Sequence, residues 1–228
     1  MSEQPPRNPL DALGGYALSF VKPGQTIGLG TGHAASAFIR ALGASGIKVR
    51  GVPTSKASEE LGRSVGIEIV SLADVKKIDT DFDGADEVDP RLNLIKGYGG
   101  ALVREKIVAV SSRRFVVLVG SEKLVPRLGH RGSIPVEVVP FGVPLVTRKV
   151  AALGLKPHVR SANGTDFISD NGNLILDCGV KRIANAARLD RELLAIPGVV
   201  GTGIFAAMAD VVLVADPSGK IRTLKRAR

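Results

Sequence analysis

Short apolar segments alternate with helical patterns through the first 120 residues, and this alternation constrains the fold more than any other feature of the sequence. The expected strands cover residues 26–30, 47–52, 67–70, 78–82 and 115–120, and the expected helices cover residues 34–42, 55–65 and 101–110. Strands that alternate with helices form parallel sheets, because a parallel neighbour is reached only through a crossover connection, which is usually a helix. The chain is therefore predicted to be an α/β protein with helices on both faces of a parallel sheet.

The segments around this pattern indicate how the chain divides into domains. Asn8 followed by Pro9 predicts the start of a helix, because asparagine caps helices and proline is favoured at the first helical position. After residue 130 the sequence changes to short strands around one helix, with a pair typical of hairpin turns at Asn171-Gly172. The apolar segment 209–215 can return to the first sheet. We expect a Rossmann-like parallel-sheet domain of residues 1–130 plus 204–228, and a smaller α+β domain of residues 131–203.

The charge of the chain raises the question of a nucleic-acid partner. Residues 220–228 contain five basic residues and no acid, which is more than half of the formal net charge of +9. Short basic runs are usually solvated, so a frayed basic tail is expected here. The sequence has no tryptophan and two tyrosines, and so lacks the aromatic platforms of proteins that bind single strands. No nucleic-acid partner is expected.

Cysteine content and hydropathy indicate the compartment. The single cysteine, Cys178, excludes an internal disulfide and fits a reducing environment, and a small buried apolar role is its simplest interpretation. Residues 1–10 have no apolar core of the signal-peptide type. The most apolar run, residues 199–215, is interrupted by glycines and Asp210 and is too short to span a membrane. A cytoplasmic protein without a membrane partner is expected.

A glycine-rich loop joins the first expected strand to the helix that follows it. Gly28, Gly30 and Gly32 let backbone N–H groups and the helix N-terminus face an anion, which predicts a phosphate site. The loop is a poor dinucleotide fingerprint, because that pattern needs a glycine in place of His33. It is not a P-loop either, since the G-K-[ST] ending is absent. A tight turn that binds no ligand is the alternative.

Charged side chains gather within residues 83–107, around the ends of two apolar runs. Asp83 and Asp86 follow an expected strand and so lie at its carboxyl end, where open α/β sheets bind their ligands. Lys96 follows the second apolar run, and the glycines at 97, 99 and 100 leave room for a ligand to approach the backbone.

Glu105 lies on the helix expected at residues 101–110. The predicted buried stripe of this helix consists of Leu102, Val103, Ile107 and Val110. This pattern puts Glu105 on the exposed or cleft-facing side, between Arg104 and Lys106. Three carboxylates and a lysine beside a phosphate loop suit acid–base chemistry on a polyhydroxylated phosphate.

A divalent metal is the competing use of Asp83, Asp86 and Glu87. No histidine accompanies these acids, and the D-x-[DN]-x-[DN]-G calcium pattern is missing. We therefore expect neither a metal site nor a metal cofactor.

Six segments in order resemble ribose-5-phosphate isomerase of the A type over nearly the whole chain. They are GLGTGHAASAFI, PTSKASEELGRSVGI, DGADEVDPRLNLIKGYGGALVREKIVA, PVEVVPFG, DNGNLILD and IPGVVGTGIF. The resemblance implies an aldose–ketose isomerase that interconverts D-ribose 5-phosphate and D-ribulose 5-phosphate through a cis-enediol, without a cofactor. It also implies a place in the pentose phosphate pathway and a homo-oligomer, either a dimer or a tetramer.

The same resemblance assigns roles to individual residues. It implies that Glu105 carries the proton between C1 and C2, and that Asp83, Asp86 and Lys96 assist ring opening and proton movement on the sugar oxygens. Lys96 would also offset the charge of the enediolate. The implied substrate-binding residues are Thr31, Gly32, His33, Ala34, Gly84, Ala85, Gly97, Tyr98, Gly99 and Lys123.

Four segments depart from the family pattern, and one of them is the N-terminal helix, which lacks the lysine expected near position 10 or 11. The family's T-G-S-T loop is Thr31 to Ala34 here, so two hydroxyl groups have become an imidazole and a methyl group. Tyr98 introduces a Cβ into the family's K-G-G-G, where glycine would be needed if φ were positive. Gly120 replaces the leading acid of D-x-S-K. These departures leave a second interpretation open, a non-catalytic sugar-phosphate-binding paralogue of the same fold.

Overall fold

The structure is a computed structural model that describes residues 8–226, and these residues divide into two compact units. The first unit comprises the described residues up to Gly84 together with Ile107–Lys123 and the residues from Ala209 onward. The second unit comprises Ala85–Lys106 and Leu124–Met208. Within the described residues, no helix is long and apolar enough to cross a membrane.

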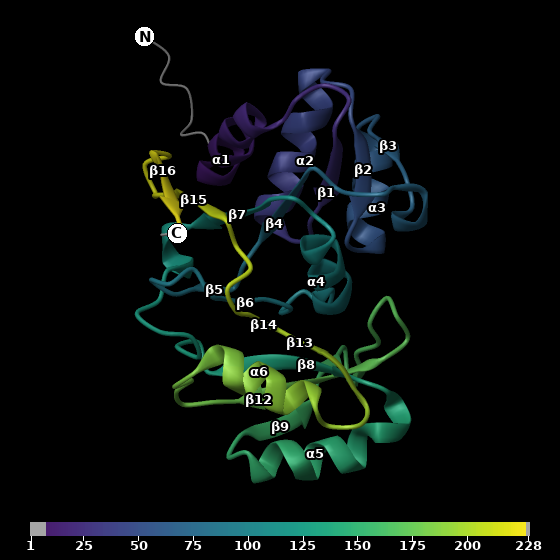
Figure 1. Ribbon diagram of the computed structural model, residues 1–228, viewed down its shortest axis with the longest axis vertical. Coiled ribbons are helices and arrows are strands. Elements are labelled where there is room, and N and C mark those ends of the chain that lie inside the picture. The colour runs from purple at the N-terminus through teal and green to yellow at the C-terminus, as the bar shows by residue number, and fades with distance from the viewer. Residues whose placement is uncertain (1–7, 227–228) are drawn as a thin grey trace. The chain divides into compact units, whose positions relative to one another are not determined.

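The first unit is built on a seven-stranded sheet in the order β16-β15-β7-β4-β1-β2-β3 (Figure 1). The strands are β1 (Thr26–Leu29), β2 (Arg50–Pro53), β3 (Glu68–Ile69), β4 (Thr80–Gly84), β7 (Phe115–Gly120), β15 (Val211–Ala215) and β16 (Ile221–Lys225). All neighbours pair in parallel except β15 and β16. The predicted parallel α/β sheet is confirmed, and β4 is its central strand.

Helices cover both faces of this sheet, as predicted. They are α1 (Pro9–Ala17), α2 (His33–Ser45), α3 (Lys56–Ser64) and α4 (Leu102–Val110), with short 3₁₀ helices η1 (Leu18–Phe20), η2 (Leu72–Asp74) and η3 (Ser121–Lys123). Ile27 and Leu29 of β1 belong to one core cluster with Phe38 of α2. Gly28 faces the other way, because a Cβ on it would lie 2.7 Å from the side chain of Val108 on α4. The predicted cap of α1 is also confirmed, since Asn8 Oδ1 accepts a 3.1 Å hydrogen bond from the Leu10 N–H.

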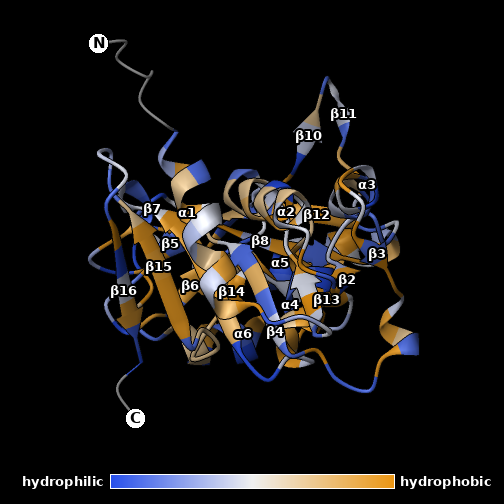
Figure 2. Ribbon diagram, turned by 90° about the horizontal axis from the view of Figure 1, so that it is seen from above, coloured by the Kyte–Doolittle hydropathy of each residue, from blue (hydrophilic) through white to orange (hydrophobic). Residues whose placement is uncertain are grey.

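The expectation of a frayed basic tail is wrong for residues 221–225, which form the edge strand β16. This strand pairs with β15 from end to end, and β15 is hydrophobic along its length (Figure 2). The turn between them is tied by Asp216, whose Oδ1 accepts hydrogen bonds from the Ser218 and Lys220 N–H groups. Basic residues on an edge strand hinder pairing with another chain, which gives the charge run a structural use.

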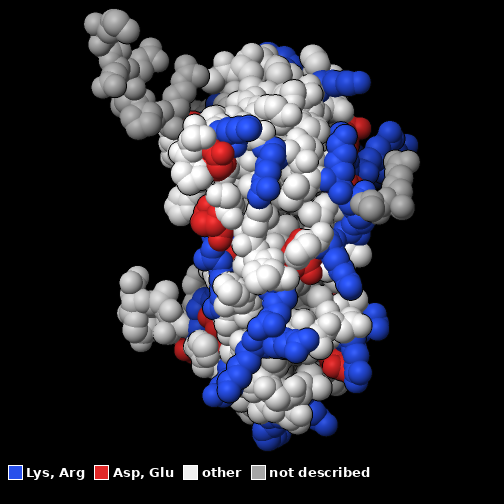
Figure 3. Space-filling view, turned by 90° about the vertical axis from the view of Figure 1, so that its left-hand side faces the viewer, with Lys and Arg blue, Asp and Glu red and all other residues white. Residues whose placement is uncertain are grey.

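Basic side chains also predominate over acidic ones on the face drawn in Figure 3, in keeping with the net charge of +9. The last two residues of the expected tail, 227 and 228, lie outside the described residues.

The second unit contains small sheets and short helices. A four-stranded antiparallel sheet has the order β13-β8-β12-β9, a three-stranded sheet has the order β14-β6-β5, and β10 pairs with β11 in a two-stranded sheet. The strands are β5 (Glu87–Val88), β6 (Leu94–Ile95), β8 (Ser133–Val138), β9 (Lys156–Val159), β10 (Ser161–Ala162), β11 (Thr165–Asp166), β12 (Leu174–Gly179), β13 (Val199–Thr202) and β14 (Ile204–Phe205). The helices are η4 (Pro140–Gly142), α5 (Val143–Ala152) and α6 (Ala186–Leu194).

The core of the second unit lies between the four-stranded sheet and its helices. Val146 and Val150 of α5, Leu193 of α6 and Cys178 of β12 belong to one buried cluster. Burial raises the pKa of the Cys178 thiol to about 12, so this cysteine serves as a small apolar residue, as expected. The predicted hairpin turn is confirmed too, because the Gly172 N–H donates to Ser169 O inside an antiparallel bridge between Ile168 and Leu174.

The compact units divide the chain at residues other than the predicted 131 and 204. Residues 85–106 belong to the second unit, because β5 pairs with β6, and β6 pairs with β14, rather than with the parallel sheet. Residues 124–130 belong there as well, since Val125 and Leu128 lie in the second unit's core.

Candidate active site

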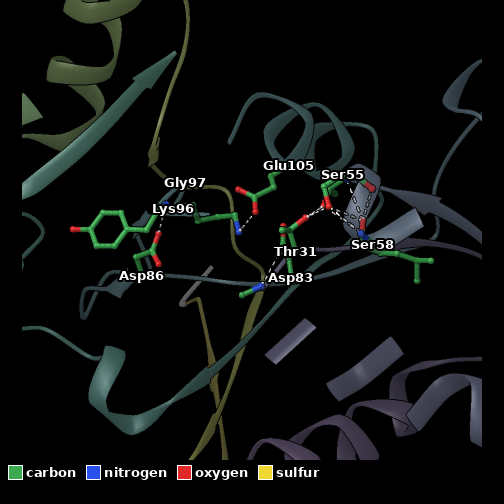
Figure 4. A network of polar contacts seen from close by, with 12 residues as sticks. Thr31, Ser55, Ser58, Asp83, Asp86, Lys96, Gly97 and Glu105 are labelled. Atoms are coloured by element: carbon green, nitrogen blue, oxygen red, sulfur yellow. Dashed lines mark hydrogen bonds and ion pairs between the residues drawn. The ribbon is translucent and has the colours of Figure 1, made fainter. Parts of the chain in front are cut away.

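The glycine loop and Asp83 form one group of candidate residues, which lies in the first unit. Asp83 is fully buried at the carboxyl end of β4. Its Oδ1 accepts hydrogen bonds from the Thr31 N–H at 2.9 Å and from the Gly84 N–H at 2.7 Å (Figure 4). Gly30 allows this approach, because a Cβ at that position would lie 2.3 Å from Asp83 Oδ1. The loop is thus fastened to the end of β4 through a carboxylate.

The N-terminus of α2 follows this loop directly. Gly32 is the N-cap at φ +102°, with no side-chain hydrogen bond to cap the helix. His33 is the first helical residue and is exposed, whereas Ala34 packs against the core. The first N–H groups of a helix have no partners within the helix, and the helix dipole favours an anion there. This arrangement suits a phosphate group.

Hydrogen bonds between hydroxyl side chains connect the glycine loop to the start of α3. Thr31 Oγ1 lies 2.8 Å from Thr54 Oγ1 and donates a 2.8 Å hydrogen bond to Ser55 Oγ. Ser55 in turn caps α3, because its Oγ accepts from the Ser58 N–H at 3.1 Å. Sequence reasoning did not select Thr54, Ser55 or Ser58. The available signal was the capping pattern formed by a serine three residues before another serine at the start of a helix.

Lys123 ends η3, which follows β7 directly. Because β7 and β4 are parallel neighbours, the ends of both strands lie at the same edge of the sheet. Lys123 is half-buried there.

Glu105 and Lys96 form a second group of candidate residues, which lies in the second unit. Lys96 Nζ and Glu105 Oε1 are 3.4 Å apart, and the two side chains are 3% and 5% exposed (Figure 4). The backbone of Lys96 is fixed through its N–H, which donates to Gly203 O at 2.9 Å. In a buried ion pair of this kind the surroundings have a low dielectric constant. The electrostatic attraction between the carboxylate and the ammonium group is therefore stronger than it would be in water.

The predicted buried stripe of α4 is correct at Leu102 but wrong at Ile107 and Val110. Ile107 and Val110 are 43% and 68% exposed, whereas Leu102, Glu105 and Val108 are buried. The prediction assumed that apolar residues mark the buried side, but the buried side of this helix contains an acid with a basic partner.

Arg104 and Lys106, the neighbours of Glu105, are not simply solvent-facing. Arg104 donates to Asn171 Oδ1 and Asp170 O. Lys106 Nζ donates to Ile204 O at 2.8 Å and lies 3.4 Å from Asp190 Oδ1. Burial lowers the pKa of Lys106. These contacts hold α4 in place on both sides of Glu105.

Asp86 and the glycine turn 97–100 complete this group. Asp86 Oδ2 accepts a 3.0 Å hydrogen bond from the Tyr98 N–H. Positive φ occurs at Gly97 (+99°) and Gly100 (+87°) but not at Tyr98. The Cβ of Tyr98 is therefore compatible with the turn. Burial raises the pKa of Tyr98 to about 12, and its hydroxyl lies 3.3 Å from Ser133 O.

Glu87, the third acid considered as a metal ligand, binds backbone N–H groups of the 129–131 loop. Its carboxylate accepts hydrogen bonds from the N–H groups of Gly129, His130 and Arg131 at 2.7, 3.3 and 2.5 Å. These contacts give Glu87 a structural use, the fastening of the 129–131 loop.

Comparisons with known proteins identify the family of the chain. The family model of ribose 5-phosphate isomerase A (phosphoriboisomerase A) matches residues 50–219. The ribose-5-phosphate isomerase A of Roseiflexus castenholzii is 48% identical over 89% of each chain.

Two solved structures extend this similarity to the fold. A D-ribose-5-phosphate isomerase in complex with phospho-erythronic acid is 38% identical, with a TM-score of 0.92 over 98% of this chain and 100% of that one. The ribose 5-phosphate isomerase A of Methanocaldococcus jannaschii is 41% identical, with a TM-score of 0.90 over 95% and 98% of the two chains. The chain belongs to the ribose 5-phosphate isomerase A family.

Proposed function

We propose that Glu105 is the base that moves a proton between C1 and C2 of the sugar phosphate. The chain is an aldose–ketose isomerase for D-ribose 5-phosphate and D-ribulose 5-phosphate. The single observation that supports the role of Glu105 most directly is its buried ion pair with Lys96 at 3.4 Å. A carboxylate removed from water, with a cation beside it, suits proton transfer to and from carbon.

The proposed reaction follows from the chemistry of these groups. Glu105 takes the proton from C2 of the open-chain aldose, and the electrons of the C–H bond move toward the carbonyl to give a cis-enediolate. The ammonium group of Lys96 offsets the negative charge that develops on the sugar oxygens. The C2 hydroxyl then passes its proton to the oxygen on C1, which becomes a hydroxyl group. Protonated Glu105 returns its proton to C1, and C2 becomes the ketone carbonyl.

Asp83 and Asp86 are proposed to serve the sugar hydroxyl groups during ring opening and proton movement. Each carboxylate is held by backbone N–H groups, Asp83 by those of Thr31 and Gly84 and Asp86 by that of Tyr98. The phosphate group is assigned to the N-terminus of α2. His33 supplies a side-chain donor there, and the remaining contacts are proposed for Gly32, Ala34, Ala85, Gly99 and Lys123.

A coupled assay on the purified chain tests this function. Ribose 5-phosphate should be converted to ribulose 5-phosphate, and phospho-erythronic acid should inhibit competitively. A chain that binds ribose 5-phosphate without turnover would favour the non-catalytic paralogue, which no comparison supports.

The finer assignments are proposals as well. We propose that the enzyme acts in the cytoplasm, within the pentose phosphate pathway, as a homodimer. An exposed apolar patch supports self-association: Phe141 is 96% exposed, and Val139 and Val200 are 42% and 39% exposed. The segments that carry them are joined, because the Val139 N–H donates to Gly198 O. Sedimentation of F141E as a monomer, against a wild-type dimer, would support this assignment.

A further inference from the structure

We propose that Arg160, held by Asp177, is a positioning residue for Asp86 and acts through the peptide group between Gly97 and Tyr98. This inference rests on the proposed function, in which Asp86 assists the isomerisation. All five residues belong to the second unit.

Arg160 is fixed at the end of β9 by its backbone and its side chain. Its N–H donates to Ile175 O at 2.8 Å. Its guanidinium forms a two-pronged pair with Asp177 of β12, from Nε to Oδ2 at 2.8 Å and from Nη2 to Oδ1 at 2.6 Å. Such forked pairs define the orientation of the guanidinium plane as well as its place. The Arg160 and Asp177 side chains are 12% and 19% exposed, so the pair is shielded from solvent.

The remaining nitrogen of this guanidinium holds the glycine turn. Arg160 Nη1 donates to Gly97 O at 2.9 Å and to Tyr98 O at 3.0 Å. Glycine has more backbone freedom than other residues, and Gly97 and Gly100 both have positive φ. The hydrogen bonds to the carbonyl groups of Gly97 and Tyr98 restrict this freedom directly after Lys96.

One peptide group connects Arg160 to Asp86. The carbonyl of Gly97 and the N–H of Tyr98 belong to the same planar amide, in which they point in opposite directions. Arg160 binds the carbonyl end, and the N–H end donates to Asp86 Oδ2 at 3.0 Å. A cation at the oxygen polarises the amide and strengthens its N–H as a donor. The guanidinium therefore orients the Asp86 carboxylate without touching it.

The ring of Phe167 supports the same turn from the side of Arg160. Its centroid lies 5.7 Å from the guanidinium carbon of Arg160. A Cβ on Gly100 would lie 2.4 Å from a carbon of this ring. The turn therefore packs closely against Phe167 at Gly100, where a side chain would collide with the ring.

A double-mutant cycle with Asp86 tests the proposal. We expect R160M to lower kcat by about 10- to 100-fold, as for a misplaced catalytic group, with KM changed by less than about threefold. In a D86N background, R160M should lower kcat by less than about threefold more, because the group that Arg160 orients is already lost. R188M is the matched control, since Arg188 pairs with Glu192 on the exposed surface of α6, and it should match the wild type.

Three outcomes would overturn the proposal. Equal losses from R160M in both backgrounds would show that Arg160 acts independently of Asp86. A folded R160M enzyme with normal kcat would show that catalysis does not need Arg160. A D86N enzyme as active as the wild type would overturn the role of Asp86 itself, and the role of Arg160 with it. If R160M does not fold, R160K, which keeps a cation without the fork, is compared in the same two backgrounds against the same criteria.

Discussion

Lys96 and Glu105 form a buried ion pair, with 3.4 Å between Nζ and Oε1, although they are nine positions apart in the sequence. Both side chains are shielded from solvent, so water cannot replace either partner of the ion pair. The turn that contains two positive-φ glycines brings the two residues together, because it reverses the chain between β6 and α4. Predictions for both residues follow from this pairing.

Replacing Glu105 by glutamine keeps its shape and removes the base. Turnover of E105Q should fall by at least about 100-fold, as is typical when general-base catalysis is lost. Wild-type enzyme in D₂O should incorporate deuterium into the sugar at carbon, and E105Q should not. The exposed substitution E60Q is the control. Near-normal turnover by E105Q would remove Glu105 from the mechanism.

Replacing Lys96 by methionine should affect both catalysis and stability. Turnover should fall by about 10²- to 10³-fold, the usual loss for a group that stabilises developing charge. The free energy of unfolding should fall by about 3 to 5 kcal/mol, since Glu105 stays buried without this cation. The double variant K96M/E105L should be more stable than K96M in urea titrations. A double variant less stable than K96M would contradict this account of the pair.

His33 is expected to contribute to substrate affinity more than to turnover. It is exposed at the first position of α2, where an imidazole N–H can reach a bound phosphate. H33A should therefore raise KM and leave kcat within about threefold, because binding of a remote group is lost in ground and transition states alike. H33S/A34T, which restores the family's hydroxyl groups, should recover the affinity. Unchanged constants in H33A would leave the loop backbone as the phosphate site.

Deleting residues 220–228 should destabilise the first unit, because it removes β16 from the edge of the sheet. Val212 and Leu213 of β15 are fully buried, and they would lose their neighbour on one side. The melting temperature should fall by more than about 4 °C, which for a chain of this size corresponds to more than about 1 kcal/mol. R222Q/K225Q, which removes charge and keeps the strand, should melt within about 2 °C of the wild type. Equal melting of the truncated and full-length chains would show that β16 adds no stability.

Exhaustive dialysis against EDTA should leave the rate unchanged. Glu87 is engaged by three backbone N–H groups, and the cation beside Glu105 is Lys96. A rate that is lost on dialysis and restored by a single divalent ion would instead identify the nearby acids as ligands.

The sheet and the glycine loop were predictable because their signals are local. Each strand of the parallel sheet is a short apolar run, and the loop lies between such a run and a helix. The position of Glu105 was not predictable from periodicity, since its burial depends on a lysine reached through a turn. The edge strand β16 was hidden by its charge, although Gly219 in the preceding turn, at φ +82°, was a hairpin signal.

The contacts of Arg160 depend on strand register, which the sequence alone does not define. Arg160 reaches Asp177 because β9 and β12 pair in an antiparallel register that matches His158 with Asp177. It reaches Gly97 across 63 positions of the chain. A shift of that register by one residue would turn its side chain to the opposite face of the sheet.

The close approach of Gly30 to Asp83 limits how this loop can be re-engineered. Glycines in such loops are usually explained by the anion they admit, yet a side chain at position 30 would meet the carboxylate first. A library that randomises residues 31, 33 and 34, and leaves Gly32 at its positive φ, can therefore search for new ligand preferences while the acid stays in place. Randomising position 30 as well would displace the Asp83 carboxylate and change the anion-binding loop at the same time. Most variants in such a library would then be inactive, and their ligand selectivity could not be measured.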